Sequence, residues 1–212
     1  MHTKKLNGFL VNKKVILFLN GEKPHHFPAF SNQDLIYCTD GSYTYLKENN
    51  IVPHVISGDF DSISIPTPVS GIRIIETPHQ DYTDFEKALQ IIQDDGYTNV
   101  EVYGASGKEQ DHFIGNLNAA LKFKTQLNIT FYDNYSRYYF LNNLENINCR
   151  IGQKVSLVPF PQADGIITKG LKYPLHHESL TLTGRIGTRN EAIAEEISIQ
   201  FQSGNLLIYL IE

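Results

Sequence analysis

The sequence predicts an α/β protein in two parts: a mostly parallel, Rossmann-like α/β sandwich over residues 1–134 and an antiparallel β-sandwich over residues 135–212. In the first part, short apolar runs alternate with helix-like stretches, a pattern typical of a parallel sheet covered by helices. The second part shows strand-like runs separated by turn residues, which indicates an antiparallel sandwich or barrel. The charge divides at the same point. Residues 1–134 carry 16 acidic and 11 basic side chains, whereas residues 135–212 carry 7 of each.

Six apolar runs of the first part are predicted as buried strands, because glycine, proline, asparagine or aspartate bounds them. These runs are Val15–Leu19, Leu35–Cys38, Val52–Ser57, Ile72–Ile75, Val100–Tyr103 and Ile129–Tyr132. Helices are predicted between them, over Tyr43–Asn49, Asp84–Asp95 and His112–Thr125. The middle helix is the clearest, since its apolar residues recur at the i, i+3, i+4, i+7 spacing of one buried face. Thr83 and Glu86 have the spacing of a capping box and predict where this helix begins.

From Tyr135 onward the pattern predicts strands without amphipathic helices. The candidate strands are Arg137–Leu141, Val155–Phe160, Leu180–Thr183, Ile197–Phe201 and Leu206–Ile211. Ser203-Gly204-Asn205, between the last two, is predicted as a hairpin loop.

The composition narrows the class of protein. With 212 residues, 41% hydrophobic and 19% charged, the chain is globular rather than disordered, collagenous or coiled-coil. Its net charge of −5 argues against a nucleic-acid binder or a polybasic membrane-surface protein. The run Val15–Leu19 is too short for a membrane span or a signal peptide. The two cysteines, Cys38 and Cys149, show no disulfide pattern, so we expect a reducing, cytoplasmic location and no membrane partner.

Aspartates follow four of the predicted strands. In chain order they are Asp40, then Asp59 and Asp61, then Asp81 and Asp84, then Asp111. Because the carboxyl ends of parallel strands share one edge of a sheet, where ligands bind, we expect these side chains to converge. Taken singly, Asp40 fits a turn and Asp84 fits the first turn of a helix. Four coincident strand ends favour a common site.

Crowded carboxylates require cations, and Mg²⁺ is usually held by one or two carboxylates together with substrate phosphates. The helix starts near Asp84 and Asp111 offer unpaired N–H groups to phosphate oxygens. Lys108 and His112 lie close enough in the sequence to add positive charge or donors. These features predict a nucleotide or pyrophosphate substrate. The sequence contains no G-x-x-x-x-G-K-[ST] phosphate loop, G-x-G-x-x-G dinucleotide pattern or nucleophile elbow.

Several blocks of residues occur in an order that resembles one family. Gly58-Asp59-Phe60-Asp61-Ser62-Ile63 matches a G-D-F-D-S-I block, and residues 80–89 are similar to a D-x-T-D-x-x-K-A-L block. Residues 39–42, 104–116, 170–175 and 187–191 resemble A-D-G-G, G-A-x-G-G-R-x-D-H-x-x-x-N, G-L-x-Y-x-L and G-x-S-N-E. The blocks span most of the chain, from Asp40 to Glu191. The family that they resemble is the thiamin pyrophosphokinases, or thiamin diphosphokinases.

This resemblance implies an enzyme that transfers the pyrophosphoryl group of ATP to the hydroxyl of thiamin, giving thiamin diphosphate and AMP, with Mg²⁺ as cofactor. It implies that residues 1–134 form the catalytic domain that binds ATP and Mg²⁺. Residues 135–212 would bind thiamin, at the interface of a homodimer. Because the chain has no tryptophan, a ring that stacks on thiamin must belong to tyrosine or phenylalanine.

The resemblance also implies roles for individual residues. The implied metal ligands are Asp59, Asp61 and Asp84. Asp40 would be a further ligand or a contact to the attacking hydroxyl, and Asp81 is a candidate for either task, so that these five aspartates form the predicted catalytic set. The implied ATP-binding residues are Gln80, Thr83, Lys108, Asp111, His112 and Asn116. The residues implied near thiamin are Thr188 and Asn190.

Three positions depart from the family's blocks. Ser42 stands where a second glycine is usual, which restricts the backbone there. Lys108 and Glu109 stand where glycine and arginine are common, and Glu109 would repel phosphates unless it turns outward. Arg189 replaces a serine before Asn190 and would repel the positively charged thiamin unless it points away.

Two other interpretations stay open from the sequence. A metal-dependent nucleotide or diphosphate hydrolase, or a sugar-nucleotide transferase, would also use the Asp59-x-Asp61 pair, but it leaves the other blocks unexplained. A nucleotide- or thiamin-binding sensor without catalysis would account for Glu109 and Arg189. Release of AMP that requires thiamin would separate both from the leading interpretation.

Overall fold

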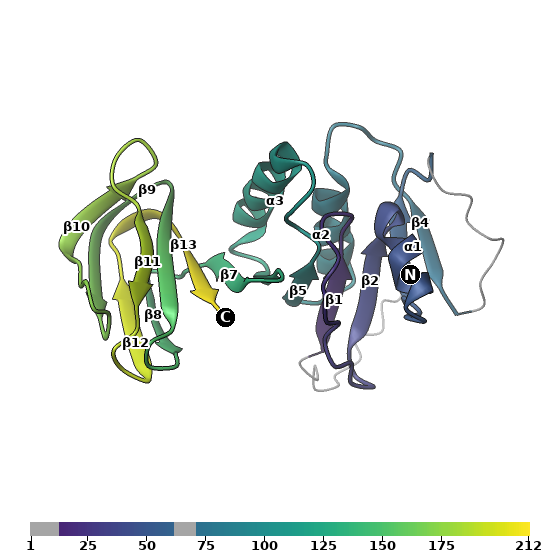
Figure 1. Cartoon of the computed structure of the whole chain (residues 1–212). Helices are drawn as coiled ribbons and strands as arrows, with labels where there is room; N and C mark the ends of the chain where they lie inside the picture. The colour runs from purple at the N-terminus through teal and green to yellow at the C-terminus, as the bar shows by residue number, and fades with distance from the viewer. Residues whose placement is uncertain (1–12, 62–70) are drawn as a thin grey trace, which may run out of the picture.

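The computed structural model describes residues 13–61 and 71–212 (Figure 1). These residues form three helices and thirteen strands, joined by turns and loops. The first six strands are parallel and lie in the order β4-β3-β2-β1-β5-β6. They are β1 (Lys14–Phe18), β2 (Leu35–Thr39), β3 (Val55–Gly58), β4 (Arg73–Glu76), β5 (Asn99–Tyr103) and β6 (Asn128–Tyr132). Strands therefore occur at all six predicted places, with shifted ends, but β4, at the edge of the sheet, is mostly exposed rather than buried. Ser62 and Ile63 of the G-D-F-D-S-I block lie outside the described residues.

Helices pack on both faces of this parallel sheet. They are α1 (Asp40–Glu48), α2 (Asp84–Asp94) and α3 (Gln110–Phe123). Alternate side chains of β1 point to opposite faces. Val15 and Leu17 lie in one core with α2 and α3, whereas Ile16 and Phe18 lie in a second core with α1. The sequence around β1 is apolar on both faces because each face is covered.

The start of α2 follows the predicted capping box. Thr83 Oγ1 accepts a hydrogen bond from Glu86 N at 3.2 Å. The four residues of the predicted apolar face are all buried: Phe85, Ala88, Leu89 and Ile92. Local capping and the buried face thus agree on the first residue of this helix, Asp84.

The strand order places a topological switch point between β1 and β5. From β1 the chain builds outward through β2, β3 and β4, and then returns to add β5 and β6 on the other side of β1. A switch point opens a crevice outside the carboxyl ends of the strands. Just beyond these ends, Gly21 N donates to Gly104 O at 2.8 Å. A Cβ at Gly104 would lie 2.4 Å from Leu19 O, so this close approach of the two segments requires glycine.

The strands from β7 onward pair in the antiparallel sense. They are β7 (Ser136–Phe140), β8 (Leu144–Asn148), β9 (Lys154–Lys169), β10 (His176–Thr181), β11 (Gly187–Glu191), β12 (Glu196–Gln200) and β13 (Ser203–Ile211). The long strand β9 pairs with β13 along one edge and with β10 and β11 along the other. A separate core, which includes Leu157, Ile166 and Ile208, lies among these strands. We call residues 13–134 the α/β region and residues 135–212 the β region.

One hydrogen-bonded sheet joins the two regions, because β7 pairs with β6 on one edge and with β13 on the other. Phe131 of β6 lies opposite Tyr138 of β7, and their ring centroids are 4.9 Å apart in a stacked pair. Tyr138, fully buried, also stacks on Tyr209 of β13 with centroids 4.8 Å apart. On the other side Phe85 of α2 contacts Phe131. The core of the α/β region therefore continues into the β region.

Several boundaries differ from the sequence prediction. α1 begins at Asp40 rather than Tyr43, because Asp40-Gly41 forms the first turn of the helix instead of a separate turn. The predicted hairpin loop at residues 203–205 is wrong. Ser203 and Gly204 belong to β13 and pair with β9, so the turn lies at residues 201–202. β8 and β11 were not predicted, because they are mostly exposed or half-buried and lack a run of apolar residues.

A helix that spans a membrane must be both long and apolar. Among residues 13–61 and 71–212, no helix meets that requirement.

Candidate active site

A cavity of about 560 Å³ opens at the carboxyl edge of the parallel sheet. Its walls come from the segments that follow β1 to β5 and from the first turns of α2 and α3. The predicted site residues that line it are Asp40, Asp59, Asp61, Gln80, Asp81, Thr83, Asp84, Lys108, His112 and Asn116. The strand ends thus bring these residues together at the switch point, and the role of each remains a prediction.

Asp40 is the buried carboxylate of this cavity, with 7% of its surface exposed. Its Oδ1 accepts a hydrogen bond from Gly41 N at 2.6 Å, and its Oδ2 accepts one from Phe60 N at 3.0 Å. A Cβ at Gly58 would lie 2.2 Å from Asp40 Cγ, so glycine at position 58 makes room for the carboxylate. Burial raises the pKa of Asp40, the two N–H bonds oppose that rise, and the charges of Asp84 and Asp59 add to it.

Asp59, directly after β3, is held by a side chain from the segment between β4 and α2. Gln80 Nε2 donates to Asp59 Oδ2 at 3.0 Å. This bond is the largest of the causes that lower the pKa of Asp59, and the nearby charge of Lys87 acts in the same direction. The pKa of Asp40 is therefore raised and that of Asp59 lowered within one cavity. Opposite pKa shifts are a feature of sites in which neighbouring carboxyl groups have different tasks. Gln80, which the resemblance assigned to the nucleotide, orients Asp59 in this structure.

Lys87 also lines the cavity, although the sequence analysis gave it no role. Its Nζ lies 2.8 Å from Asp84 Oδ1, and it donates to Thr77 O at 2.9 Å and to His79 O at 3.3 Å. Only 10% of the Lys87 side chain is exposed. The signal that could have identified it is its spacing. Residues three apart in a helix are neighbours, and the capping box fixes Asp84 at the start of that helix.

The segment from Gly104 to Glu109 carries the chain from β5 into α3. Asn116 Nδ2 donates to Ala105 O at 2.8 Å and so holds this segment against the helix. Lys108 Nζ donates to Asn20 O at 2.8 Å and contacts Asn20 Oδ1 at 3.2 Å, which ties the segments after β1 and β5 together. Lys108 has a φ of 56°. A left-handed conformation costs a non-glycine residue roughly 1–2 kcal/mol, which accounts for the glycine that is usual at this position.

The other departures differ in their surroundings. Ser42 is fully buried in the first turn of α1, and its Oγ lies 2.8 Å from Phe18 O and 2.7 Å from Thr39 O, so its hydroxyl has acceptors. Glu109 is the N-cap residue of α3 and is among the residues that line the cavity, and its exposed carboxylate lies 3.7 Å from His112 Nε2. Arg189 is exposed and left-handed, with a φ of 55°, and its backbone N–H donates to Ser156 Oγ.

The oxygen donors of the cavity suit a magnesium ion that is shared with a phosphate. Within residues 13–61 and 71–212, no three His, Cys, Asp or Glu side chains lie close enough together to hold a metal by themselves. Mg²⁺ does not require such a cage, because it keeps several waters and binds one or two carboxylates plus substrate phosphates. Asp59 and Asp84 lie near enough to raise the pKa of Asp40. The carboxylates are therefore gathered where a hard cation would relieve their repulsion.

Three predicted site residues lie outside the residues that line this cavity. Asp111 is in the first turn of α3, where its Oδ1 accepts a hydrogen bond from His112 N. Thr188 and Asn190 are in β11 of the β region. The Asn190 amide is bound to the backbone of Tyr173: Oδ1 accepts from Tyr173 N at 3.1 Å, and Nδ2 donates to Tyr173 O at 2.7 Å.

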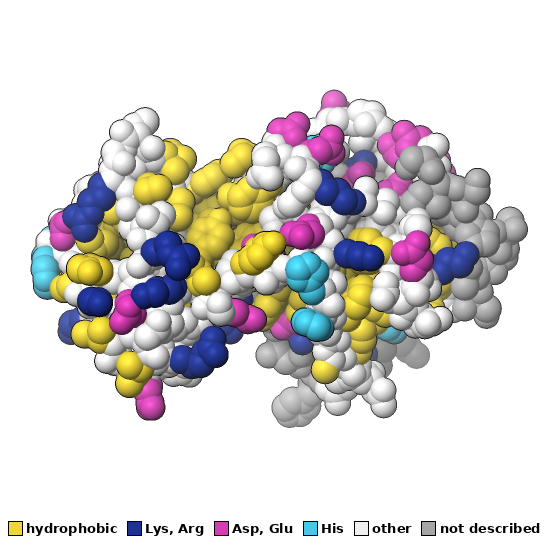
Figure 2. Space-filling view, in the orientation of Figure 1, with side chains coloured by type: hydrophobic (Ala, Val, Ile, Leu, Met, Phe, Trp, Pro, Cys, Tyr) yellow, Lys and Arg dark blue, Asp and Glu magenta, His cyan; other side chains and the backbone are white. Residues whose placement is uncertain are grey.

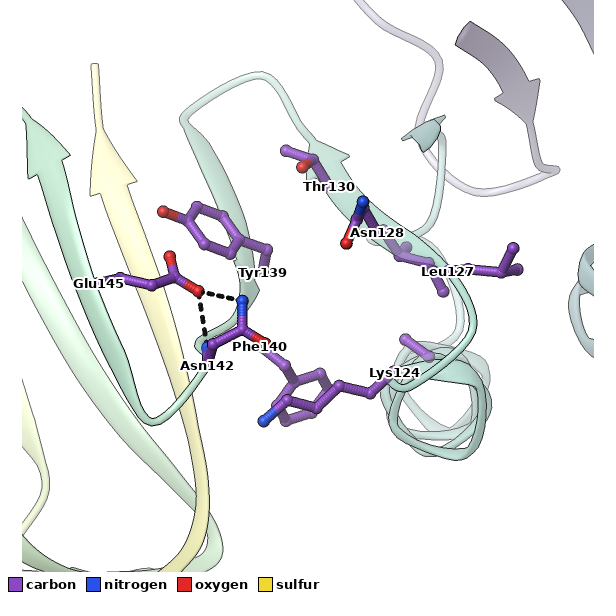
Figure 3. Close-up of a pocket in the computed structure, with 10 residues that line it drawn as sticks. Lys124, Leu127, Asn128, Thr130, Tyr139, Phe140, Asn142 and Glu145 are labelled. Atoms are coloured by element: carbon purple, nitrogen blue, oxygen red, sulfur yellow. Dashed lines mark hydrogen bonds between the residues drawn. The ribbon is translucent and has the colours of Figure 1, made fainter. Parts of the chain in front are cut away.

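A smaller cavity, of about 240 Å³, lies where the two regions meet (Figure 3). It is lined by the end of α3, by β6 and β7, and by Asn142 and Glu145. Glu145 Oε1 accepts hydrogen bonds from Asn142 N and Nδ2, as the dashed lines in Figure 3 show. None of the predicted site residues lines this cavity, so the acidic cavity remains the candidate active site.

Comparisons with known proteins point to one family. Two family models match the chain: thiamin pyrophosphokinase, catalytic domain, over residues 28–131, and thiamin pyrophosphokinase, vitamin B1 binding domain, over residues 144–206. The chain is 27% identical to Thiamin pyrophosphokinase 1 of Caenorhabditis elegans over 99% of this chain and 95% of that protein. It is also 27% identical to the thiamine pyrophosphokinase of Bacillus subtilis, over 77% of this chain and 80% of that protein.

Solved structures show the same fold. The crystal structure of the Bacillus subtilis thiamine pyrophosphokinase matches with a TM-score of 0.81 at 23% identity, over 93% of this chain and 98% of that chain. That of the Geobacillus thermodenitrificans enzyme matches with a TM-score of 0.82 at 20% identity, over 94% and 97%. The two family models lie in order along the chain and together cover most of it. The chain therefore belongs to the thiamin pyrophosphokinase family.

Proposed function

We propose that the acidic cavity is where this enzyme, a thiamin pyrophosphokinase by family, binds ATP with Mg²⁺ and passes the pyrophosphoryl group to the hydroxyl of thiamin. The products are thiamin diphosphate and AMP. The observation that carries the proposal is the convergence of Asp40, Asp59, Asp61 and Asp84 at the switch point of the parallel sheet. In this proposal residues 1–134 are the catalytic domain, and residues 135–212 are the thiamin-binding domain, with its strands arranged as a sandwich.

The aspartates divide between metal binding and contact with the acceptor. We assign Asp59, Asp61 and Asp84 to Mg²⁺, with one or two of them binding an ion together with phosphate oxygens, because no three acidic side chains of the described residues form a metal site by themselves. The ion would neutralise charge on the phosphate oxygens when bound. Asp40 would accept the hydrogen bond of the attacking thiamin hydroxyl, since its raised pKa makes it a better proton acceptor than an ordinary aspartate. Asp81 lines the same wall and would contact bound waters or ligands.

ATP would bind across the first turns of α2 and α3. Both helices begin at the cavity, so their unpaired N–H groups are available to phosphate oxygens. Lys108, His112 and Asn116 would hold the nucleotide from the α3 side, and Gln80 and Thr83 from the α2 side. Asp111 is assigned here to the same nucleotide, from the first turn of α3. Catalysis by such an arrangement is chiefly positioning and charge neutralisation.

Thiamin would reach this cavity from the β region of a second copy of the chain. Thr188 and Asn190 do not line the cavity of their own chain, which supports a homodimer in which one copy completes the site of the other. Figure 2 shows apolar side chains gathered in the hollow between the β region and the α/β region, a surface suited to such an arrangement. A cytoplasmic location belongs to the same proposal and agrees with the two free thiols of Cys38 and Cys149.

The experiment that tests this function is an AMP-release assay with the purified chain. AMP should form when ATP, Mg²⁺ and thiamin are all present, in a 1:1 ratio with thiamin diphosphate. Omission of thiamin should abolish it. Release of ADP or inorganic phosphate without thiamin would instead identify a hydrolase, and tight calorimetric binding of ATP and thiamin without product would identify a sensor.

A further inference from the structure

Lys87 differs from an ordinary substrate-binding lysine in how its ammonium group is bonded. A lysine ammonium group has three N–H donors and no acceptor. At Lys87 three oxygens lie around Nζ: Asp84 Oδ1 at 2.8 Å, Thr77 O at 2.9 Å and His79 O at 3.3 Å. These acceptors can take all three donors, and the side chain is nine-tenths buried. In this state Lys87 has no donor left for a phosphate, although it lines the cavity.

The partners of Lys87 lie in two parts of the site. Asp84 is the first residue of α2, and its carboxylate is one of the proposed metal ligands. Thr77 and His79 belong to the segment between β4 and α2, which also carries Gln80 and Asp81 into the cavity. The ammonium group therefore joins this segment to the helix that follows it.

We propose that Lys87 is the positioning residue of the acidic cavity: its ammonium group orients the Asp84 carboxylate and fixes the β4–α2 segment, which in turn places Gln80 against Asp59. The proposal rests on the proposed function of the cavity and adds a residue to it. Because Asp84 Oδ1 is bound to Lys87, Oδ2 is left to face a cation. The charge of Lys87 also offsets part of the repulsion among the carboxylates before any metal binds.

The test compares Lys87→Met with Lys122→Met. Methionine keeps most of the stem volume but removes the charge and the donors. Lys122 is a matched control, because its Nζ lies 3.0 Å from Glu86 Oε1, also on α2, and it does not line the acidic cavity. We expect kcat for AMP release to fall about 10- to 100-fold in Lys87→Met, as is typical when a group that orients a metal ligand is removed. The Lys122→Met protein should stay within about twofold of the unchanged chain.

A second readout needs no metal, substrate or activity. Hydrogen exchange of the metal-free protein should show faster exchange of the backbone amides of residues 77–83 in Lys87→Met, and no change there in Lys122→Met. A lysine that served only the stability of the fold would lower Tm while leaving kcat per folded molecule and the exchange of this segment unchanged. That result would overturn the proposal, as would a kcat for Lys87→Met equal to that of Lys122→Met.

Lys87→Arg keeps a cation and donors and provides the rescue arm, including the case in which Lys87→Met does not fold. It should retain more than a tenth of the activity of the unchanged chain and most of the protection of residues 77–83. A folded Lys87→Arg protein with neither would contradict the proposal. If the unchanged chain itself forms no thiamin-dependent AMP, the proposed function fails, whereas the exchange of residues 77–83 still tests the role of Lys87.

Discussion

The α/β region and the β region present their candidate residues in opposite ways. In the α/β region the carboxyl ends of parallel strands deliver aspartates from three separate stretches of sequence into one cavity. In the β region Thr188 and Asn190 lie on β11, whose register against β9 shifts between Gly187 and Asn190. A parallel sheet gathers its strand ends at one edge, whereas an irregular strand at the side of an antiparallel sheet displays its residues outward. Under the proposed function, the first arrangement would form a site within one chain, and the second would need the surface of another copy to complete it.

The largest effect on activity is expected from a comparison of two aspartates, one in each region, that accept similar hydrogen bonds. Asp59 accepts a hydrogen bond from the amide of Gln80, and Asp164 of the β region accepts hydrogen bonds from the amide of Gln162. Asp59→Asn should lower kcat for AMP release about 10³-fold, because it removes charge at the proposed metal and phosphate site. Asp61→Asn should behave in the same way, and both proteins should keep their Tm.

Asp164→Asn is the control, since it removes an equally exposed and similarly bonded carboxylate from the other region. Its activity should stay within twofold. Full activity in Asp59→Asn or Asp61→Asn would contradict the metal assignment. Equal losses of activity in all three variants would show that the effect does not depend on the acidic cavity.

The second prediction tests the joint between the two regions. Tyr138→Ala removes the buried ring that stacks on both Phe131 and Tyr209, so unfolding in urea should require about 3–5 kcal/mol less free energy. Tyr173→Ala, at a ring that is 63% exposed, should change stability by no more than about 0.5 kcal/mol. If Tyr138→Ala left the urea midpoint of unfolding unchanged, the stacked rings between the two regions would contribute nothing to the stability of the fold.

The third prediction concerns pH and the scaffold of the α/β region. Burial raises the pKa of Asp95, but hydrogen bonds from Arg73 and Tyr37 outweigh it, so that the pKa is lowered overall. An aspartate with a lowered pKa stabilises the fold above its unfolded pKa of about 4 and loses that contribution as the pH falls through the folded value. Asp95→Ala should therefore cost about 1–2 kcal/mol at pH 7 and less at pH 3.

Urea unfolding at the two pH values measures this difference. Asp94, the residue before Asp95 and the last of α2, accepts only a surface hydrogen bond from Gln90 among the contacts described, so Asp94→Ala serves as the control. A gap between Asp95→Ala and the unchanged chain that widened at low pH would contradict the sign of the shift.

The smallest effect is expected in the β region. Asn190→Ala removes the two hydrogen bonds that hold the backbone of Tyr173, and should raise KM for thiamin about 5-fold while leaving KM for ATP unchanged. Steady-state kinetics with each substrate varied in turn measures both values. An increase in KM for ATP alone would show that β11 serves the nucleotide and would weaken the contrast between the regions.

The sequence predicted best where local and long-range signals agree. The capping box and the buried face of α2 both point to Asp84. The apolar runs mark the inner strands of the parallel sheet because both faces are covered, whereas the edge strand β4 is mostly exposed. Prediction was poorest where strands carry little apolar pattern, as in β8 and β11. β9 was predicted to end at Phe160, because Pro161 and Gly165 resemble turn residues, yet it runs to Lys169.

The same limit applies to the site. Strand ends and blocks of residues predicted the convergence of Asp40, Asp59, Asp61, Asp81 and Asp84, since topology decides it, whereas Asp111 lies outside the residues that line the cavity. Bonds between side chains, such as Gln80 to Asp59 or Lys87 to Asp84, depend on distances that spacing does not give. Position within a block therefore indicated that Gln80 belongs to the site, but only the structure shows that it reaches a carboxylate.

The pairing of β6 with β7 has a consequence for the boundary at residue 134. A chain that ended there would leave β6 as an open edge strand, with unpaired N–H and C=O groups along the side that β7 covers. It would also expose the face of Phe131 that Tyr138 protects. Such a fragment would offer both a hydrogen-bonding template and an apolar surface to its neighbours, so we expect it to aggregate. The acidic cavity lies in one region, but protection of this strand edge depends on both regions.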